Sequence, residues 1–396
     1  MTIKCLACGS NLRDRLFCIP ELPLVDSFTN SIEEALKIPC FTVDLRQCNK
    51  CLTVQIADPP DTSEIYRNYI YDSSSSPDLE KHFEDYAQYI HSLLRDHNEP
   101  ILEIGANDGL LLEKLNQIGF TNLAGIDPSP QTKNINICDA EIINDFFNAV
   151  SAGRLSAKKY RLIIANNCFS HIPNLSETLS LCAELLTDDG ALIVEVQSCL
   201  DLVEGVIFDY IYHEHFYYHS AQSFQRLANI SGLELYNIEH VETKGGSYRF
   251  MLGIPGAHNV SQSVNYWIYR EEIAQIHTRH PWTLLERYLD ITKQSLFNLV
   301  SRERAKIVGY GASATGTVLL RYMGLEKEVE CIVDDNVKRQ GLFSPKTAIP
   351  ILSPSILSNK DVCLILAWRH SKFIIPGLDK IGVRHISPLP FLRTDG

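Results

Sequence analysis

An alternation of short apolar runs with amphipathic segments constrains the fold of this chain more than any other feature of its sequence. The apolar runs are residues 101–104, 123–127, 161–165 and 191–196. Strands that alternate with helices in this way pair in parallel and are covered by helices on both faces. The pattern predicts an α/β fold with a doubly wound, mainly parallel sheet, which strands at 232–239 and 247–252 would close.

Two pairs of cysteines mark a separate N-terminal unit. Six of the twelve cysteines precede residue 52, and four of them have the spacing C-x-x-C twice: Cys5 with Cys8, and Cys48 with Cys51. Two such turns place four thiolates around one zinc ion and leave no open position, so we expect structural zinc. Residues 9–47 exceed the linker of a compact zinc ribbon, which predicts an inserted hairpin. The alternative is that these thiols only fill a core.

The length of the chain requires more than one core. A chain of 396 residues exceeds the roughly 100–200 residues of an ordinary domain. Residues 260–300 have a helical pattern, and a second strand–helix unit begins at 306–311. We therefore expect three parts. They are a zinc-binding domain (1–62), a central Rossmann-like domain with preceding helices (63–259), and a helical connector with a C-terminal Rossmann-like domain (260–396).

The charge balance restricts the partners. With 36 basic and 48 acidic residues the formal net charge is −12. Nucleic acids and anionic membranes select basic surfaces, so we expect neither as a partner. No run approaches the roughly 18 apolar residues of a membrane helix, and no signal peptide is apparent, which favours a cytoplasmic protein. The sequence leaves the oligomeric state open.

The turn after the first central strand has the composition of a nucleoside site. It contains Glu103, Gly105, Asn107 and Gly109, and Asp127 ends the next strand. Ligands of open parallel sheets bind beyond the carboxyl ends of the strands. Carboxylates here disfavour a pyrophosphate but suit the cationic S-adenosylmethionine, with Asp127 on its ribose; an ordinary turn without ligand is the alternative. Adenine contacts are expected from the segment after the third strand: Asn144, Asp145 and Phe146.

Residues 212–219 concentrate chemistry-bearing side chains. Three histidines, one glutamate and three tyrosines occupy eight positions that follow the strand at 191–196, near the carboxyl edge of the sheet. Histidine is the usual general base near neutral pH, and Glu214 would tune or orient it. A metal site is less consistent with the spacing, because H-E-H lacks the i, i+4 pattern of a helical zinc motif. A surface loop with satisfied aromatic side chains is the third interpretation.

Together these motifs resemble those of the three-domain sugar C-methyltransferases, which act on nucleotide-linked keto-deoxysugars. The resemblance covers nearly the whole chain, and Y-H-E-H together with the zinc pairs is quite specific. Its motifs are the two C-x-x-C pairs and the segments 103–109, 165–167, 171–173, 211–215, 245–249, 309–312 and 333–336.

The resemblance implies a division of roles among the residues. It implies that the middle domain binds S-adenosylmethionine and that the nucleotide sugar lies between the flanking domains. His215 would be the base, assisted by other residues of the site: Tyr212, Glu214, His171 and Tyr71. Further cofactor contacts would come from Asn166 and Asn167. Sugar-nucleotide contacts are expected from Arg249, Lys244, Gly311 and Lys338.

The implied chemistry agrees with the residue types. A ketone acidifies the neighbouring C–H, so His215 would remove that proton and the enolate would take the methyl group, without a catalytic metal. In one departure from the family, the glycine turn at 311–316 lacks the lysine that related proteins often carry. A cation from elsewhere would then have to meet the diphosphate: Lys306, Lys338, Arg339 or Arg321.

Three other functions fit parts of the sequence. A methyltransferase acting on oxygen or nitrogen would use the same cofactor turn. An NAD-dependent oxidoreductase would use the G-x-G-x-x-A motif that begins at Gly309, with Asp334 on the ribose. A non-catalytic zinc module would use only the cysteine pairs.

Overall fold

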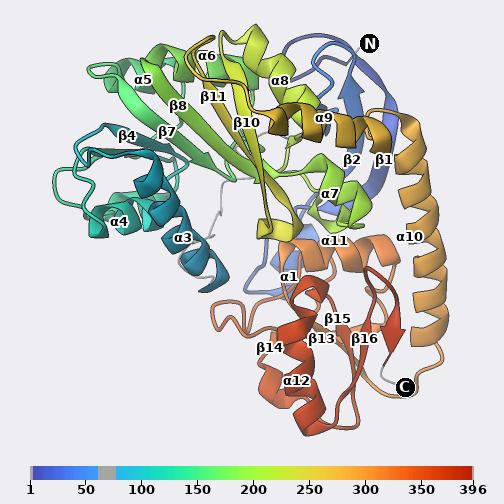
Figure 1. The fold of residues 1–396 in the computed structure, drawn as a ribbon. Coiled ribbons are helices and arrows are strands. Elements are labelled where there is room, and N and C mark those ends of the chain that lie inside the picture. Colours follow the sequence, from blue (N-terminus) through green and yellow to red (C-terminus); the bar gives the residue numbers. More distant parts are fainter. Residues whose placement is uncertain (1–2, 61–76, 395–396) are drawn as a thin grey trace.

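The computed structural model describes residues 3–60 and 77–394, which form three sheets with helices packed around them (Figure 1). The N-terminal sheet is antiparallel, with the strand order β1-β2-β3-β9. Its elements are β1 (Leu12–Pro23), α1 (Ile32–Lys37), β2 (Cys40–Cys48), β3 (Val54–Ile56) and β9 (Tyr217–Tyr218). β1 and β2 form the inserted hairpin predicted between the cysteine pairs. β9 belongs to the histidine-rich segment, and its pairing with β3 fixes that segment against the N-terminal sheet.

The central sheet has the strand order β10-β11-β8-β7-β4-β5-β6. Its strands are β4 (Ile101–Ile104), β5 (Leu123–Ile126), β6 (Glu141–Ile143), β7 (Tyr160–Asn166), β8 (Leu186–Gln197), β10 (Glu234–Val241) and β11 (Ser247–Gly253). The strands from β8 to β6 are parallel, whereas β11 is antiparallel to both of its neighbours. The predicted mainly parallel sheet is thus confirmed, although β8 begins directly after the preceding helix and is longer than expected.

Helices cover both faces of this sheet, because successive buried residues of a strand point to opposite sides. On one face, α3 and α4 pack around Ile101 and Ile164. On the other face, α5, α6 and α8 pack around Leu102 and Ile163. These helices are α3 (Pro77–Leu93), α4 (Leu110–Gln117), α5 (Ala149–Leu155), α6 (Leu175–Leu185) and α8 (Ala221–Ile230). This arrangement leaves the carboxyl edge of the sheet open to a ligand.

The C-terminal sheet has the order β14-β13-β12-β15-β16-β17 and is parallel except for β17. Its strands are β12 (Ile307–Tyr310), β13 (Val329–Val333), β14 (Ile351–Leu352), β15 (Val362–Ile365), β16 (Arg384–Ser387) and β17 (Arg393–Thr394). Helices α11 (Ala314–Met323) and α12 (Ser371–Ile381) follow β12 and β15. Because the strand order reverses between β12 and β15, their carboxyl ends form the natural ligand edge of this sheet.

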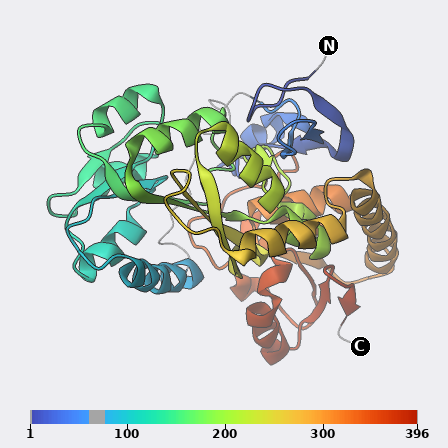
Figure 2. The same cartoon turned by 45° about the horizontal axis from the view of Figure 1, so that its top comes forward.

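Helix α10 joins the parts of the chain. The connector consists of α9 (Gln262–Ala274) and α10 (Arg279–Val300), and α10 runs along one side of the molecule (Figures 1 and 2). Trp282 of α10 packs on Phe17 of β1 at 6.5 Å between ring centroids, and Phe17 stacks on Tyr322 of α11 at 5.9 Å. One hydrophobic core therefore extends from the N-terminal sheet to the C-terminal domain. In the described residues, no helix is both long and apolar enough to span a bilayer.

Candidate active site

A cavity of about 2050 Å³ lies where the three parts of the chain meet. One wall is the carboxyl edge of the central sheet, after β4, β5, β6 and β7, and the other is formed by the segments that follow β12, β13 and β15. A pocket for one small molecule usually has roughly 300–1,000 Å³. The cavity therefore has room for two ligands, one against each sheet.

The turn after β4 shapes the first wall. Gly105 has a φ of 80°, and a Cβ atom there would lie 2.6 Å from Cβ of Cys168, so only glycine fits. Glu103 lines the cavity, and its buried Oε2 atom has no hydrogen-bond partner among the described residues. Burial, and then repulsion from Asp127 and Asp108, raises the pKa of Glu103 well above its usual range. A cationic ligand group would stabilise these carboxylates.

Most of the side chains expected to contact the cofactor line this wall. They are Glu103, Gly105, Asn107, Asp127, Phe146, Asn166 and Asn167. Gly109, Asn144 and Asp145, which were also expected to contact the cofactor, are not among the residues that line this wall. Gly109 is the left-handed N-cap residue of α4. Nδ2 of Asn144 donates to the backbone oxygens of Asp127 and Ser129 at 2.9 and 2.6 Å, so Asn144 holds the loop after β5.

The histidine-rich segment connects the 3-10 helix η3 (Phe208–Tyr210) to β9 and contributes selectively to the cavity. Tyr212, Glu214 and His215 line it. His213 and His219 lie in the core instead, and Nε2 of His213 is 3.4 Å from the backbone oxygen of Phe41. In the part of the chain that the structure describes, the histidines and glutamate of this segment form no group with metal-binding geometry.

His215 is held in one orientation. Its Nδ1 atom lies 2.8 Å from the backbone oxygen of Tyr210. Because a carbonyl oxygen can only accept, Nδ1 carries the proton of the neutral ring and Nε2 keeps the lone pair. The ring centroid is 4.2 Å from that of Tyr212 and 5.0 Å from that of His171. Burial, and then His171, lowers the pKa of His215 well below its usual value, so the ring is neutral at pH 7.

His171 is a second neutral imidazole in the cavity wall. Burial, with the charge of Lys244 as the next cause, lowers its pKa to about 4. Lys244 reaches the cavity from the turn between β10 and β11, where its backbone is left-handed. Both expected residues therefore lie at the cavity together with His215.

Glu214 and Asp26 bring two carboxyl groups to the cavity from different parts of the chain. Burial, and then the proximity of Asp26, raises the pKa of Glu214 to about 8, so Glu214 is mostly protonated at pH 7. Burial also raises the pKa of Asp26, against the effect of Arg339, whose Nη2 lies 3.6 Å from Asp26 Oδ1. Sequence reasoning missed Asp26, because a single acid in the loop after β1 has no local motif.

Basic side chains line the second wall. They are Lys338, Arg339, Arg369 and Lys372, beside Gly311, whose φ of 108° and close approach to Ala367 require glycine. Two other basic residues considered as replacements for the missing lysine lie elsewhere. Lys306 pairs with Glu330 at 3.6 Å, and Arg321 pairs with Glu326 at 2.9 Å.

Asp334 lines the cavity, but both of its carboxylate oxygens already accept hydrogen bonds within its own domain. Its oxygens accept from the backbone nitrogens of Ala312 and Asn336, each at 2.7 Å. The acid that an NAD-dependent enzyme would use on the ribose therefore closes the glycine turn of its own domain. This arrangement disfavours the oxidoreductase interpretation.

Arg249 and Tyr71 differ from the other expected substrate contacts. Arg249 is buried outside the cavity wall, where it pairs with Glu195 at 2.8 Å and Glu239 at 3.3 Å and lies 4.0 Å above the ring of Tyr86. Its donors are thus used between β11 and α3, which corrects its expected role as a substrate contact. Tyr71 lies outside the described residues.

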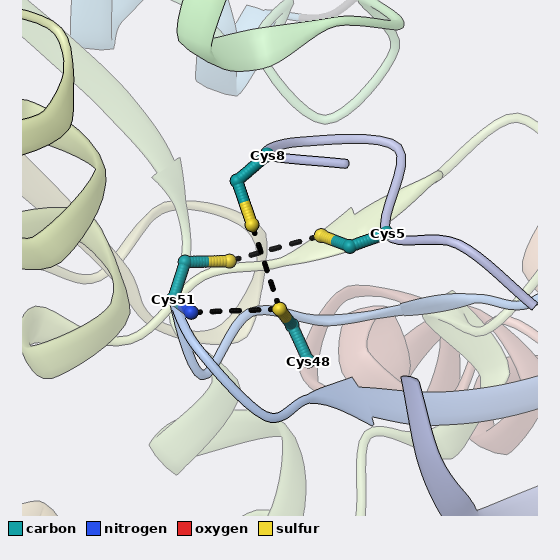
Figure 3. Close-up of side chains that lie close together, drawn as sticks. All are labelled: Cys5, Cys8, Cys48 and Cys51. Carbon is teal, nitrogen blue, oxygen red and sulfur yellow. Dashed lines mark hydrogen bonds between the residues drawn. The ribbon is translucent and has the colours of Figure 1, made fainter. Parts of the chain in front are cut away.

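The four paired cysteines converge at one point (Figure 3). Sγ of Cys5 lies 3.7 Å from Sγ of Cys51, and Sγ of Cys8 lies 3.6 Å from Sγ of Cys48. Four thiolates bound to zinc at ~2.3 Å in a tetrahedron are ~3.8 Å apart. The cluster therefore fits a four-coordinate zinc ion. None of the four residues lines the cavity, so such an ion would lie away from the site.

An open α/β sheet with a glycine turn and a cavity at its carboxyl edge is typical of proteins that bind a nucleoside or nucleotide ligand at that edge. Comparison with known proteins narrows this class. A family model described as a methyltransferase domain matches residues 79–238, and one described as a C-methyltransferase C-terminal domain matches residues 242–390. C-methyltransferase NovU from Streptomyces niveus is 26% identical to this chain in an alignment of 406 positions, which covers 99% of this chain and 96% of that protein. The chain is an S-adenosylmethionine-dependent C-methyltransferase.

Two solved structures are similar to part of the chain. The plantazolicin methyltransferase BpumL in complex with SAH has a TM-score of 0.35 at 18% identity, over 43% of this chain and 82% of that one. Magnesium protoporphyrin IX methyltransferase (ChlM) from Synechocystis PCC 6803 with bound SAM has a TM-score of 0.34 at 13% identity, over 49% of this chain and 89% of that one. At such scores they add nothing to the strand order described above.

Proposed function

We propose that the acceptor is a nucleotide-linked keto-deoxysugar and that His215 removes the proton from the carbon next to its ketone. The volume of the cavity and the opposite charge of its two walls support this acceptor. Carboxylates lie on the first wall, where a sulfonium and an amino group are favoured. Lys338, Arg339 and Arg369 lie on the second wall, where a diphosphate is favoured.

The first wall fits the cofactor. Glu103, with its unpartnered buried Oε2 atom, would meet the amino group, and Asp127 would accept from the ribose hydroxyls. Phe146, whose side chain is 54% exposed, would cover the adenine. Bound S-adenosylmethionine supplies an electrophilic methyl group on a sulfonium, which leaves as a neutral thioether. The chain's own part is to hold this group and the sugar in line, which can supply a large share of the rate enhancement.

The contact between His215 Nδ1 and the backbone oxygen of Tyr210 is the observation on which the proposal depends. It leaves Nε2 as the one basic atom of a neutral ring that lines the cavity. A positioned base of this kind contributes typically ~10²–10⁴-fold to the rate. In a histidine with a structural role, both ring nitrogens would be hydrogen-bonded within the core, and no basic nitrogen would be left to take a proton from the substrate.

The reaction balances with these residues. Nε2 of His215 takes the proton, the C–H electron pair forms the C=C bond, and the carbonyl pair moves to oxygen to give an enolate. Tyr212 and protonated Glu214, which line the cavity together with His171, would donate to that oxygen. The enolate carbon then forms the C–C bond to the methyl group. His215 afterwards releases its proton to solvent.

The zinc ion that fits the cysteine cluster would have a structural role. Its four thiolates would complete the tetrahedron, so no position is left for water or substrate. It would tie the start of β1 to the end of β2, and thereby the sheet to which β9 is added.

His215→Asn tests the proposal. Thymidine- and guanosine-diphosphate-linked keto-deoxyhexoses are screened with S-adenosylmethionine for a gain of one methyl group by mass spectrometry. We expect turnover of the active sugar to fall at least 100-fold, while the calorimetric affinity for S-adenosylmethionine is kept. His91→Asn, on the exposed side of α3, is the control and should be silent.

Hydrogen exchange separates carbon methylation from methylation of oxygen or nitrogen. With S-adenosylhomocysteine in place of the methyl donor, the wild-type protein should introduce solvent deuterium at the acceptor carbon, and His215→Asn should not. Near-normal turnover of the variant would refute His215 as the base, and methylation without any exchange would refute the enolate.

A further inference from the structure

Asp209 of the central domain is held by two side chains of the C-terminal domain. Nη1 of Arg369 lies 2.7 and 2.8 Å from its two carboxylate oxygens, and Nε1 of Trp368 donates to Oδ2 at 3.0 Å. The side chain of Asp209 is 0% exposed. Donors from another domain therefore take the place of water around this charge, which makes the contact specific in geometry.

The next residue, Tyr210, extends this contact to His215. The guanidinium carbon of Arg369 lies 4.5 Å from the centroid of the Tyr210 ring. The backbone oxygen of Tyr210 accepts from Nδ1 of His215, and its ring lies parallel to the imidazole, at 6.0 Å between centroids and 7° between planes. Helix η3 thus receives the C-terminal domain on one side and fixes the imidazole on the other.

We infer that Asp209 is a positioning residue: by engaging Arg369 and Trp368 it lets the C-terminal domain set the tautomer and the orientation of His215. The inference rests on the proposed function for the role of His215, but the positioning is a property of the chain that can be measured without a substrate. Asp209 itself lies outside the cavity wall, so its effect on a substrate would be indirect.

A contact that only joins two domains would behave differently. Arg321 provides the comparison, because it links α11 of the C-terminal domain to Glu21 of β1 at 3.4 Å, and none of its hydrogen bonds or ion pairs within the described residues reaches η3. Loss of such a pair would lower the melting temperature and leave the imidazole unchanged. Loss of the Asp209 contact should change the imidazole.

The test is nuclear magnetic resonance of ¹⁵N-histidine protein. Of the 13 histidines, His215 is assigned by the signal that disappears in His215→Asn. The nitrogen shifts of a neutral imidazole show which nitrogen carries the proton. We expect Nδ1–H in the wild type, a shift towards the Nε2–H form in Asp209→Asn, and no change in Arg321→Gln.

A second variant keeps the test decisive. Asp209→Asn leaves Arg369 as an uncompensated buried charge, so this variant could fail to fold. Asp209→Asn/Arg369→Gln removes both charges and keeps hydrogen-bonding groups, and it should show the same change of tautomer. An unchanged His215 signal in a folded Asp209→Asn protein or in the folded double variant would overturn the inference.

Kinetics give an independent readout. On the sugar found active in the mass screen, kcat of Asp209→Asn should fall about 10- to 100-fold with KM for S-adenosylmethionine unchanged, because a misplaced base costs rate and not cofactor affinity. Deuterium exchange at the sugar carbon should fall in parallel. If His215→Asn keeps its turnover while Asp209→Asn changes the tautomer, the proposed base is wrong and the positioning stands.

Discussion

Glu214→Gln tests whether the fold keeps a buried carboxyl group protonated. Burial, and then Asp26, raises the pKa of Glu214 from 4.5 to about 8. The folded protein therefore keeps a proton that the unfolded chain releases as the pH rises above about 4.5. The stability that the neutral group contributes is complete below that pH and is lost progressively up to about pH 8.

The size of the effect follows from the size of the shift. Each pKa unit corresponds to about 1.4 kcal/mol. At pH 7 the wild type has lost about 3 kcal/mol relative to low pH, by pH 8 about 4 kcal/mol, and at still higher pH about 5 kcal/mol. Glutamine cannot ionise and avoids this loss, so Glu214→Gln should be the more stable protein at neutral pH. For cores of this size 3 kcal/mol corresponds to about 6–12 °C in melting temperature.

Melting temperatures of both proteins between pH 5 and 9 measure the effect. The difference between Glu214→Gln and the wild type should grow from pH 5 to 8 and then level off. Glu34→Gln, at an exposed carboxyl of α1, is the matched control and should show no such trend. A difference that is the same at every pH would mean that Glu214 is already ionised in the fold, and the reasoning would be refuted.

The proton on Glu214 should also determine how kcat depends on pH. If neutral Glu214 donates to the enolate oxygen, kcat of the wild type should fall as the pH rises through about 8, and Glu214→Gln should have a lower kcat without this alkaline limb. The acid limb, which belongs to His215, should lie well below pH 6.5 in both proteins, because burial disfavours the imidazolium.

Two further changes test the metal site and the cofactor loop. Metal analysis should find one zinc per chain in the wild type and in the control variant Cys18→Ser. Cys48→Ser loses one of the four thiolates, so its affinity for zinc, measured by chelator competition, should be at least tenfold weaker. Equal zinc affinity in all three proteins would exclude the site. Asn144→Ala removes two hydrogen bonds to the loop that carries Asp127 and should weaken calorimetric binding of S-adenosylhomocysteine about tenfold; unchanged affinity would show that the loop holds itself.

The strands and the main turns were predictable because their signals are local. Ile101–Ile104 is buried at every position and apolar at all but Glu103, as expected of a strand that is covered on both faces. Gly105 and Gly311 follow such strands, and a left-handed backbone next to another chain segment allows only glycine. The cysteine cluster was also predictable, since each C-x-x-C pair is local and zinc supplies the reason for two pairs to meet.

Asn144 and Arg249 make contacts that no local pattern reveals. Asn144 follows a strand at the ligand edge, yet its amide is used by the backbone of the neighbouring loop. Arg249 was expected at the substrate because of the motif around it, but β11 directs it towards Glu195, a buried residue of β8. In both cases the strand that carries or precedes the residue was predicted, but tertiary packing decides which groups the side chain contacts.

The histidine-rich segment shows why the site needs all three parts of the chain. Its composition predicts a base, but its three histidines and its glutamate are all candidates by type alone, and of these four only Glu214 and His215 line the cavity. The pairing of β9 with β3 fixes one end of the segment to the N-terminal sheet, and Arg369 of the C-terminal domain fixes η3 at the other end. The segment is thus held at both ends by domains other than its own. A central domain separated from its neighbours would keep the cofactor turn, whose contacts are internal, but would lose the geometry that leaves Nε2 of His215 available as a base.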